Sequence, residues 1–260
     1  MSRIAVISDI HANLHALHAV MEDVQAEQCD SMVCLGDVVG YNAYPAECLD
    51  YIRSCNCDVV KGNHDSEVVV TTQMNMNDLA RAAMEWTRSR LSEDQLTWLS
   101  RLQYMRMVGG SLPASAKFTI VHSSLDYPKS WNYIINANDA TANFRRQFTN
   151  LCFHGHTHVP RIFCMDKASN RTFEDTDSRH ALYISGETQF VLNPDFKYFI
   201  NVGSVGQPRD NDPRACYAIY DPENHSVKIK RVVYDVAAAQ EAVRAVGLPE
   251  YLADRLARGC

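Results

Sequence analysis

The sequence lacks several features that would each define a class of protein. No stretch approaches the roughly 20 consecutive apolar residues that a membrane-spanning helix needs. No secretory leader is recognisable, because Ser2 and Arg3 lead directly into the apolar run Ile4–Ile7. There is no basic excess either, since 25 Lys and Arg residues face 31 Asp and Glu residues, for a net charge of −6. We therefore expect no membrane and no extended nucleic acid among the partners, although a small anion is compatible with locally bound metal ions.

The nine cysteines do not form a pattern typical of disulfide-built proteins. Their number is odd, and Cys34, Cys152 and Cys216 lie in apolar, strand-like runs where cysteine behaves as a small hydrophobic residue. These features predict a reducing, cytoplasmic location. Cys55 and Cys57 could bind a soft metal or oxidise, but without a second such pair we interpret them as ordinary loop and strand residues.

The composition is that of a folded protein, with 46% apolar and 22% charged residues. A chain of 260 residues can form one large domain or two small ones. Because it contains no internal repeat, low-complexity tract or convincing linker, we predict a single domain over residues 1–260. The helices expected from about residue 236 onward form an appendage to it.

Strands and helices alternate over the first 65 residues. Strands are expected at residues 3–8, 31–35 and 58–61, with helices at 14–26 (N-capped by Asn13) and 45–54. This order favours parallel pairing with right-handed crossovers. Two helices follow at 77–90 and 92–102, the second opened by a capping box of Ser92 and Gln95.

Beyond Gly110 the pattern becomes mainly that of strands. Strands are expected at 117–122, 151–154, 161–165, 182–185, 199–202, 215–220 and 226–233. Helices are expected at 138–148, 237–246 and 250–257, and polar surface loops at 166–179 and 221–225.

Polar residues follow the first three predicted strands at the point where each strand ends. In order along the chain they are Asp9 and His11, then Asp37, then Asn63, His64 and Asp65. Ligands of open α/β sheets bind beyond the carboxyl ends of parallel strands. These side chains are therefore expected to meet at one point.

Two later strands end in the same way. His122 ends one strand, and His156 and His158 follow another, beside Gly155. Carboxylates, imidazoles and an amide oxygen suit Mn, Fe, Zn or Co better than Ca or Mg, and the lack of thiolates argues against a structural zinc site. A single Asp-x-His or Gly-Asp is commonly a turn or cap. Five such elements, each placed after a strand, indicate a metal site.

These motifs resemble those of the calcineurin-like metallophosphoesterases. They read Asp9-Ile10-His11, Gly36-Asp37, Gly62-Asn63-His64-Asp65, Val121-His122 and Gly155-His156-Thr157-His158. Segments 8–14 and 201–209 are similar to the compact bacterial phosphodiesterases related to diadenosine tetraphosphatases. The resemblance runs from residue 3 to about residue 235.

The resemblance implies an α/β fold, a four-layer α/β/β/α sandwich of two mixed sheets flanked by helices. It also implies two divalent metal ions (Mn, Fe, Zn or Co). By analogy, one metal is held by Asp9, His11 and His158, the other by Asn63, His122 and His156, with Asp37 bridging them. Such a pair, about 3.5–4 Å apart, activates a bridging hydroxide for in-line attack on phosphorus.

Four further residues have predicted roles at this site. His64 is expected over the bound phosphate as a catalytic group, with Asp65 orienting its imidazole. Asn63 is expected to contact substrate as well as metal. Arg209 is either a phosphate-facing residue, as the resemblance suggests, or a solvated surface residue.

The remaining candidates have more ordinary interpretations. Asn13 is interpreted as a helix cap rather than a pocket wall, and His154 as a buried or second-layer histidine rather than a ligand. His15 and His18 are expected at the surface or rim, and His180 and His225 in or beside loops. Candidate pocket walls are residues 41–44, 74–77 and 126–133, where Tyr127 and Trp131 could stack on a base.

The sequence thus predicts a phosphodiesterase acting on a small phosphodiester or nucleotide. Alternatives are a phosphomonoesterase, a non-catalytic protein-binding scaffold on the same fold, and a nuclease for long DNA or RNA. The scaffold is disfavoured because no ligand is lost, and the nuclease because the compact acidic chain shows no basic surface. The physiological substrate, the metals used and the oligomeric state stay open.

Overall fold

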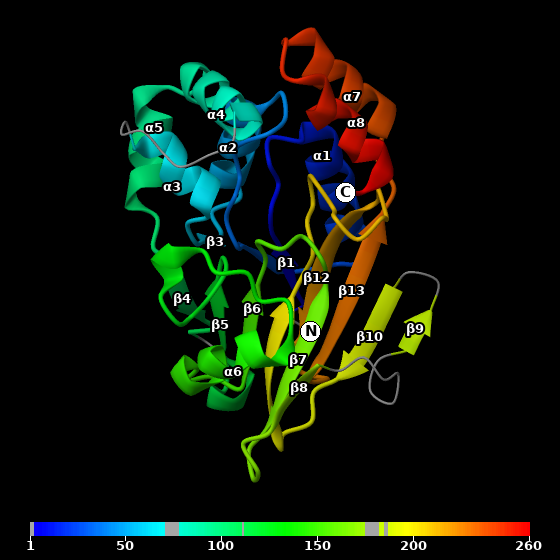
Figure 1. Ribbon diagram of the computed structural model, residues 1–260. Coiled ribbons are helices and arrows are strands. Elements are labelled where there is room, and N and C mark those ends of the chain that lie inside the picture. Colours follow the sequence, from blue (N-terminus) through cyan, green and yellow to red (C-terminus); the bar gives the residue numbers. More distant parts are fainter. Residues whose placement is uncertain (1–2, 71–77, 111, 175–181, 185–186) are drawn as a thin grey trace.

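Two β-sheets form the centre of the molecule (Figure 1). The structure is a computed structural model that describes residues 3–70, 78–110, 112–174, 182–184 and 187–260. Within these ranges one sheet has seven strands and the other has six.

The seven-stranded sheet has the order β3-β2-β1-β12-β13-β10-β9. Its members are β1 (Ile4–Ile7), β2 (Ser31–Cys34), β3 (Asp58–Val59), β9 (Leu182–Ile184), β10 (Glu187–Val191), β12 (Ala215–Asp221) and β13 (Ser226–Val232). Strands β1, β2 and β3 are parallel, as the sequence predicts, with Ile4 opposite Ser31. Strand β12 runs antiparallel to β1, so the sheet is mixed.

The six-stranded sheet has the order β4-β5-β6-β11-β7-β8. Its members are β4 (Met105–Val108), β5 (Phe118–Val121), β6 (Leu151–His154), β7 (Arg161–Asp166), β8 (Thr172–Glu174) and β11 (Phe196–Asn201). Strands β5, β6 and β11 are parallel, and the other pairings are antiparallel. The carboxyl ends of β5 and β6 therefore lie at one edge of this sheet.

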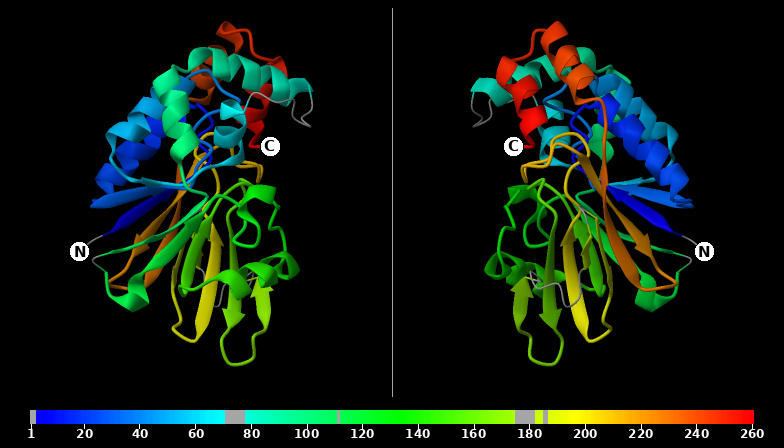
Figure 2. Two further views of the ribbon diagram at one scale, coloured as in Figure 1. Left: turned by 90° about the vertical axis from the view of Figure 1, so that its left-hand side faces the viewer. Right: turned by 90° about the vertical axis from the view of Figure 1, so that its right-hand side faces the viewer.

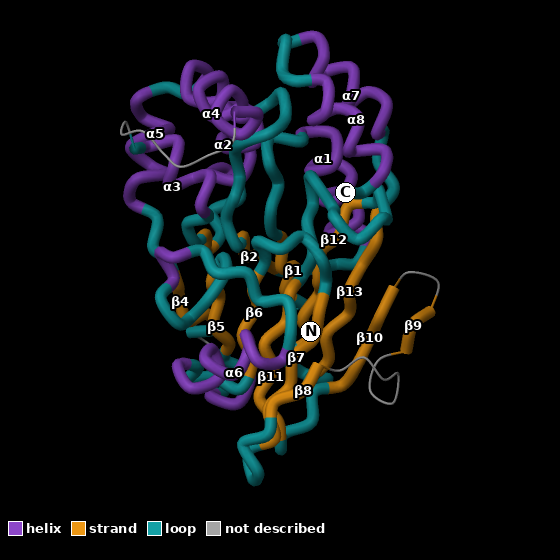
Figure 3. The backbone as a smooth tube through the Cα atoms, viewed as in Figure 1, coloured by secondary structure: helices purple, strands orange, loops and turns teal. Residues whose placement is uncertain are grey.

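Helices cover both outer faces, which confirms the predicted α/β/β/α layering (Figures 2 and 3). Helices α1 (Leu14–Ala26) and α2 (Pro45–Ser54) pack on the seven-stranded sheet through residues such as Leu17 and Leu49. Helix α6 (Ala137–Arg146) covers the six-stranded sheet through Phe144. A separate apolar core, including Phe153 and Tyr220, fills the space between the sheets.

The described residues form five further α-helices. They are α3 (Asn63–Val69), α4 (Asp78–Arg90), α5 (Glu93–Arg101) and the C-terminal pair α7 (Val236–Ala245) and α8 (Glu250–Arg258). Buried Ala239 and Leu256 of the C-terminal pair join the core around α1. The assignment of residues 1–260 to one domain stays a prediction. Among the described helices, none is long and apolar enough to cross a membrane.

Several predicted boundaries are confirmed and others are wrong. Helices α1 and α2 begin and end as predicted, Asn13 caps α1, and the Ser92–Gln95 capping box is present. The stretch 166–179 is not all loop, because it contains β8. Helix α3 and strands β4 and β10 were not predicted, and Val60 extends β3 only by an isolated bridge to Gln103.

Candidate metal centre

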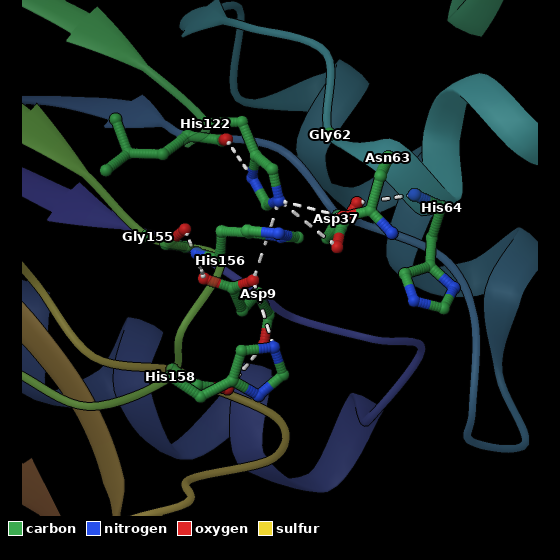
Figure 4. Close-up of polar contacts among 12 residues, drawn as sticks. Asp9, Asp37, Gly62, Asn63, His64, His122, Gly155, His156 and His158 are labelled. Carbon is green, nitrogen blue, oxygen red and sulfur yellow. Dashed lines mark hydrogen bonds and ion pairs between the residues drawn. The ribbon is translucent and has the colours of Figure 1, made fainter. Parts of the chain in front are cut away.

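The predicted metal ligands sit in sharp turns that follow the strands. Five of them have positive φ angles: Asp9 (54°), His11 (48°), Asp37 (51°), His156 (68°) and His158 (61°). Side-chain-bearing residues rarely adopt this left-handed conformation, and such strain concentrates at functional sites. The turns direct donor atoms from β1, β2 and β6 toward one region (Figure 4).

One group of donor atoms is formed by Asp9, His11 and His158, all buried. His158 Nε2 lies 3.2 Å from Asp9 Oδ1 and 3.1 Å from His11 Nε2. His11 Nε2 lies 3.7 Å from the same Asp9 oxygen. The structure thus brings together the three residues predicted to hold one metal ion.

A second, adjacent group is formed by Asp37, His122 and His156. His122 Nε2 lies 3.3 Å from Asp37 Oδ2 and 3.2 Å from Asn63 Oδ1. The same Asp37 oxygen is 3.7 Å from His11 Nε2 in the first group. Asp37 therefore stands between the two groups, where a bridging carboxylate is required.

Backbone carbonyl groups fix the orientation of four imidazoles. The Nδ1–H groups of His11 and His122 donate to the carbonyl oxygens of Val39 and Leu35, at 3.2 and 2.9 Å. His158 Nδ1–H donates in the same way to Gln207. These bonds place the proton of a neutral imidazole on Nδ1 and direct Nε2 inward, which is the orientation and tautomer that a metal-binding histidine requires. His156 is reversed, because its Nε2–H donates to the Trp131 carbonyl oxygen at 2.8 Å.

The buried carboxylates and imidazoles of the site shift one another's pKa values. Burial opposes ionisation of Asp37, but the neighbouring imidazoles, above all His122, hold the pKa of Asp37 well below its usual range. Burial also disfavours the charged form of His122, yet the Asp37 carboxylate raises the pKa of His122 to about 9. Burial lowers the pKa of His156 to about 3. A cation at this position would replace the proton that Asp37 and His122 otherwise share.

The first group passes a structural test for a bound cation. Asp9 Oδ2 accepts hydrogen bonds from Ser8 Oγ and from the His156 amide, at 2.6 and 3.0 Å. Asp9 Oδ1 is buried and has no hydrogen-bond partner in the described part of the chain, although the His11, His122 and His158 Nε2 atoms lie within 3.9 Å. Buried carboxylate oxygens are normally satisfied. A cation coordinated by this oxygen would satisfy it.

Glycines bring the backbone close to both carboxylates. A Cβ atom at Gly155 would lie 2.0 Å from Ser8 Oγ and 2.3 Å from Asp9 Oδ2. A Cβ atom at Gly62 would lie 2.0 Å from Asp37 Oδ1. Only glycine permits this approach, so these two positions fix where the carboxylates stand.

His64 lies beside the donor atoms, as predicted, but Asp65 does not contact its imidazole. The His64 amide donates to Asp37 Oδ1 at 2.8 Å, and its Nδ1 is buried without a hydrogen-bond partner among the described residues. The Asp65 carboxylate instead accepts from the backbone amides of Asp37 (2.8 Å), Val38 (3.0 Å) and Gly62 (3.1 Å). The expected Asp65–His64 contact is therefore corrected. Asp65 supports the turn that carries Asp37.

His64 also belongs to a possible third donor group with His11 and Asp37. Burial lowers the pKa of His64 to about 4. Its catalytic role stays a prediction, and a ligand role is the alternative that this grouping raises.

Arg209 lies near the site on the loop after β11. Its amide donates to the His158 carbonyl oxygen at 3.3 Å, and its Nη2 donates to Gln207 Oε1 at 3.0 Å. The guanidinium Cζ lies 5.9 Å from the ring centroid of Tyr41. Tyr41, from a segment predicted to form a pocket wall, packs against His64 at a centroid distance of 4.4 Å. Substrate binding by Arg209 and Asn63 stays a prediction.

The other predicted pocket walls have mixed outcomes. Tyr133 stacks on His156 at 4.5 Å, and Trp131 packs edge-to-face on His122 at 5.9 Å. Both therefore pack on candidate ligands, whereas Tyr127 is largely exposed. Residues 74–77 and His180 lie outside the described residues.

The remaining histidines and Asn13 match their ordinary interpretations. His154 is fully buried and stacks on Phe199 at 4.2 Å, and burial lowers its pKa to about 3. His154 belongs to none of the donor groups found among the described residues. Besides capping α1, Asn13 donates to the Gly206 carbonyl oxygen at 2.9 Å. His15 packs on Tyr44, and His18 and His225 are exposed.

Two features near the site were missed by the sequence analysis. Glu67, on α3, has a buried carboxylate oxygen without a hydrogen-bond partner among the residues described. Arg255 of α8 reaches the Tyr41 ring, with its Cζ 5.9 Å from the centroid. Because α8 is expected to be an appendage, its sequence pattern does not indicate that Arg255 lies beside Tyr41.

The site consists of two adjacent groups of carboxylates and imidazoles at the strand ends of a two-sheet sandwich. This geometry defines the class of protein. A model of the calcineurin-like phosphoesterase superfamily domain matches residues 2–225. The protein MJ0912 of Methanocaldococcus jannaschii is 35% identical over 99% of this chain and 98% of its own length.

Solved structures agree with that match. A metallophosphoesterase from Sphaerobacter thermophilus is 40% identical, with a TM-score of 0.81 over 100% of this chain and 99% of its own. The hypothetical protein PH1004 from Pyrococcus horikoshii is 18% identical and shares the fold, with a TM-score of 0.76 over 100% and 99%. The chain belongs to the calcineurin-like phosphoesterase superfamily.

Proposed function

We propose that this protein is a metal-dependent phosphodiesterase that hydrolyses a small phosphodiester or nucleotide. The observation that carries the proposal is the pair of adjacent donor groups, Asp9–His11–His158 and Asp37–His122–His156, joined at Asp37. The family supports phosphoric ester hydrolysis. The preference for diesters and the choice among Mn, Fe, Zn and Co are our proposals.

The donor set fits two divalent ions, which when bound would polarise a phosphoryl oxygen and activate water. The residues of the chain supply the rest. Asp37 holds the two positions together, and the carbonyl groups of Val39, Leu35 and Gln207 keep three imidazoles in their ligand tautomer. His64, neutral because of its burial, faces the site as a candidate proton donor or acceptor for the leaving oxygen.

The proposed setting is a reducing cytoplasm, with a small phosphorylated molecule as partner. The nine cysteines, all within the described ranges, form no disulfide, and Cys34, Cys48, Cys152, Cys164 and Cys216 are buried. The retention of every predicted donor favours an enzyme over a non-catalytic scaffold, because backbone strain of the kind seen in these turns concentrates at functional sites.

The proposal is tested with chelator-stripped protein titrated with Mn²⁺, comparing bis-p-nitrophenyl phosphate with p-nitrophenyl phosphate. We expect metal-dependent hydrolysis with the diester preferred. Asp37→Asn is the negative control, and Asp50→Asn, an exposed substitution on α2, is the matched control. A preference for the monoester would make the protein a phosphatase. Folded protein inactive with Mn²⁺, Fe²⁺, Co²⁺ and Zn²⁺ on both compounds would contradict the proposal.

A further inference from the structure

The C-terminal helix α8 places a second arginine beside the candidate active site. In Figure 1, α8 lies at the helical end of the molecule, near the chain terminus. Arg255, in the middle of α8, is half-buried, and its Cζ lies 5.9 Å from the Tyr41 ring centroid. The Arg209 Cζ lies at the same distance from the same ring. Two guanidinium groups therefore share one aromatic side chain.

Tyr41 connects this pair to the reacting end of the site. Its ring centroid is 4.4 Å from that of His64 and 4.8 Å from that of His11. Both guanidinium groups thus lie against a ring that itself packs on a candidate catalytic group and a candidate metal ligand. The Tyr41 ring thus connects both guanidinium groups to His64 and His11.

The positive charges of Arg209 and Arg255 are not neutralised by acidic side chains. Within the described ranges, neither guanidinium forms an ion pair with an Asp or Glu residue. Arg255 Nε–H donates to the main-chain oxygen of Cys260, the last residue of the sequence, and neither of its Nη groups donates to a described residue. Arg209 Nε is buried without a partner among the described residues.

Two partly buried guanidinium groups against one ring, neither paired with an Asp or Glu side chain among the described residues, form an electrostatically unfavourable arrangement that the contact of Arg255 with the Cys260 oxygen offsets only in part. Burial lowers the pKa of Arg255, and repulsion from Arg209 lowers it further. The arrangement becomes favourable when an anion binds, because guanidinium groups pair with phosphate oxygens through two parallel hydrogen bonds. The Nη groups of Arg255, next to the proposed phosphoryl-binding site, are suited to that pairing.

We infer that Arg255 and Arg209 bind a second phosphate group, next to the phosphoryl group that reacts at the metal centre. Arg255 is then a specificity-determining residue supplied by α8, which lies outside residues 2–225 matched by the superfamily domain. The substrate class it selects is an organic compound with two neighbouring phosphates. This inference rests on the proposed function for the identity of the reacting group.

The test is calorimetric binding of imidodiphosphate, a diphosphate analogue resistant to hydrolysis, and of orthophosphate to Mn²⁺-loaded protein. We expect the wild type to bind imidodiphosphate more tightly than orthophosphate. Arg255→Gln should reduce that preference by about 10- to 100-fold, the usual size of a charge-assisted hydrogen-bonded pair. Arg255→Lys, which keeps the charge without the fork, should fall between them.

The matched control is Arg258→Ala, which removes the same charge from an exposed position on α8. Arg258 contacts the Tyr251 ring, as Arg255 also does, but only Arg255 of the two is found against Tyr41. This variant should leave the preference within about 2-fold. A merely structural role for Arg255 would lower the melting temperature and leave the binding preference unchanged, which would overturn the inference. So would a wild-type protein that binds both anions equally.

Failure of the proposed function is distinguishable from failure of this inference. If the protein does not hydrolyse either ester but still binds imidodiphosphate through Arg255, the proposed function is contradicted and the second phosphate site is supported. Diester hydrolysis with binding that is insensitive to Arg255→Gln would do the opposite.

Discussion

Replacing Asp65 by asparagine tests whether this residue supports the Asp37 turn or orients His64. Asp65 is fully buried, and its two oxygens accept from the amides of Asp37, Val38 and Gly62. An asparagine side chain at this position can present only one oxygen, so its NH₂ group must face at least one backbone N–H. An unsatisfied buried donor costs about 1–3 kcal/mol.

The expected loss is the sum of two opposing effects. Two amides share Asp65 Oδ2 and lose their acceptor if the NH₂ group faces them. Burial raises the pKa of Asp65 to about 7, and repulsion from Asp37 adds to this, so removal of the charge offsets part of the loss. We expect Asp65→Asn to lower the free energy of unfolding by about 2–4 kcal/mol, a large part of the roughly 5–15 kcal/mol typical of a protein.

The assay is urea unfolding followed by far-ultraviolet circular dichroism on metal-free protein. Glu67→Gln is the matched control, since it is the same carboxylate-to-amide change on the same helix, at a residue whose buried oxygen has no partner among the described residues. Because burial raises the pKa of Glu67 to about 7, removing its charge should leave stability unchanged or raise it. Unchanged stability of Asp65→Asn together with a large fall in kcat would refute this reasoning and restore the orienting role.

Three further outcomes are expected. Gly155→Ala should abolish metal-dependent activity, because its Cβ would lie 2.3 Å from Asp9 Oδ2. The control Gly110→Ala, whose Cβ would meet no described atom within 4 Å, should behave as wild type in the same assay. His64→Ala should lower kcat by about 100-fold or more with metal content preserved by mass spectrometry; parallel loss of metal would show that His64 is a ligand. Mn²⁺ should raise the melting temperature of chelator-stripped wild type by binding the folded state, and an equal rise in Asp37→Asn would contradict the assigned site.

The parts of the fold that could be predicted from sequence are those with strong local signals. Helices α1 and α2 have apolar residues at helical spacing, with Asn13 or Pro45 at the start, and both begin and end where expected. Strand β4 was missed because three of its four residues are exposed, so it carries no buried pattern. Strand β8 is only half-buried and lies in a polar stretch.

The candidate site shows the same division. Donor residues at strand ends could be predicted to converge, because parallel strands end at one edge of a sheet. Asp65 was assigned to His64 because they are neighbours in sequence, whereas its partners, apart from Gly62, lie on the turn after β2. Arg255 reaches Tyr41 only through the packing of α8, which no local pattern encodes.

The central claim is that this chain forms a two-metal centre, and anomalous diffraction from crystals grown with Mn²⁺ tests it most directly. We predict two peaks about 3.5–4 Å apart. One should be coordinated by Asp9, His11 and His158, and the other by Asn63, His122 and His156, with Asp37 contacting both. A single peak, or a peak coordinated by His64 together with His11 and Asp37, would contradict the account.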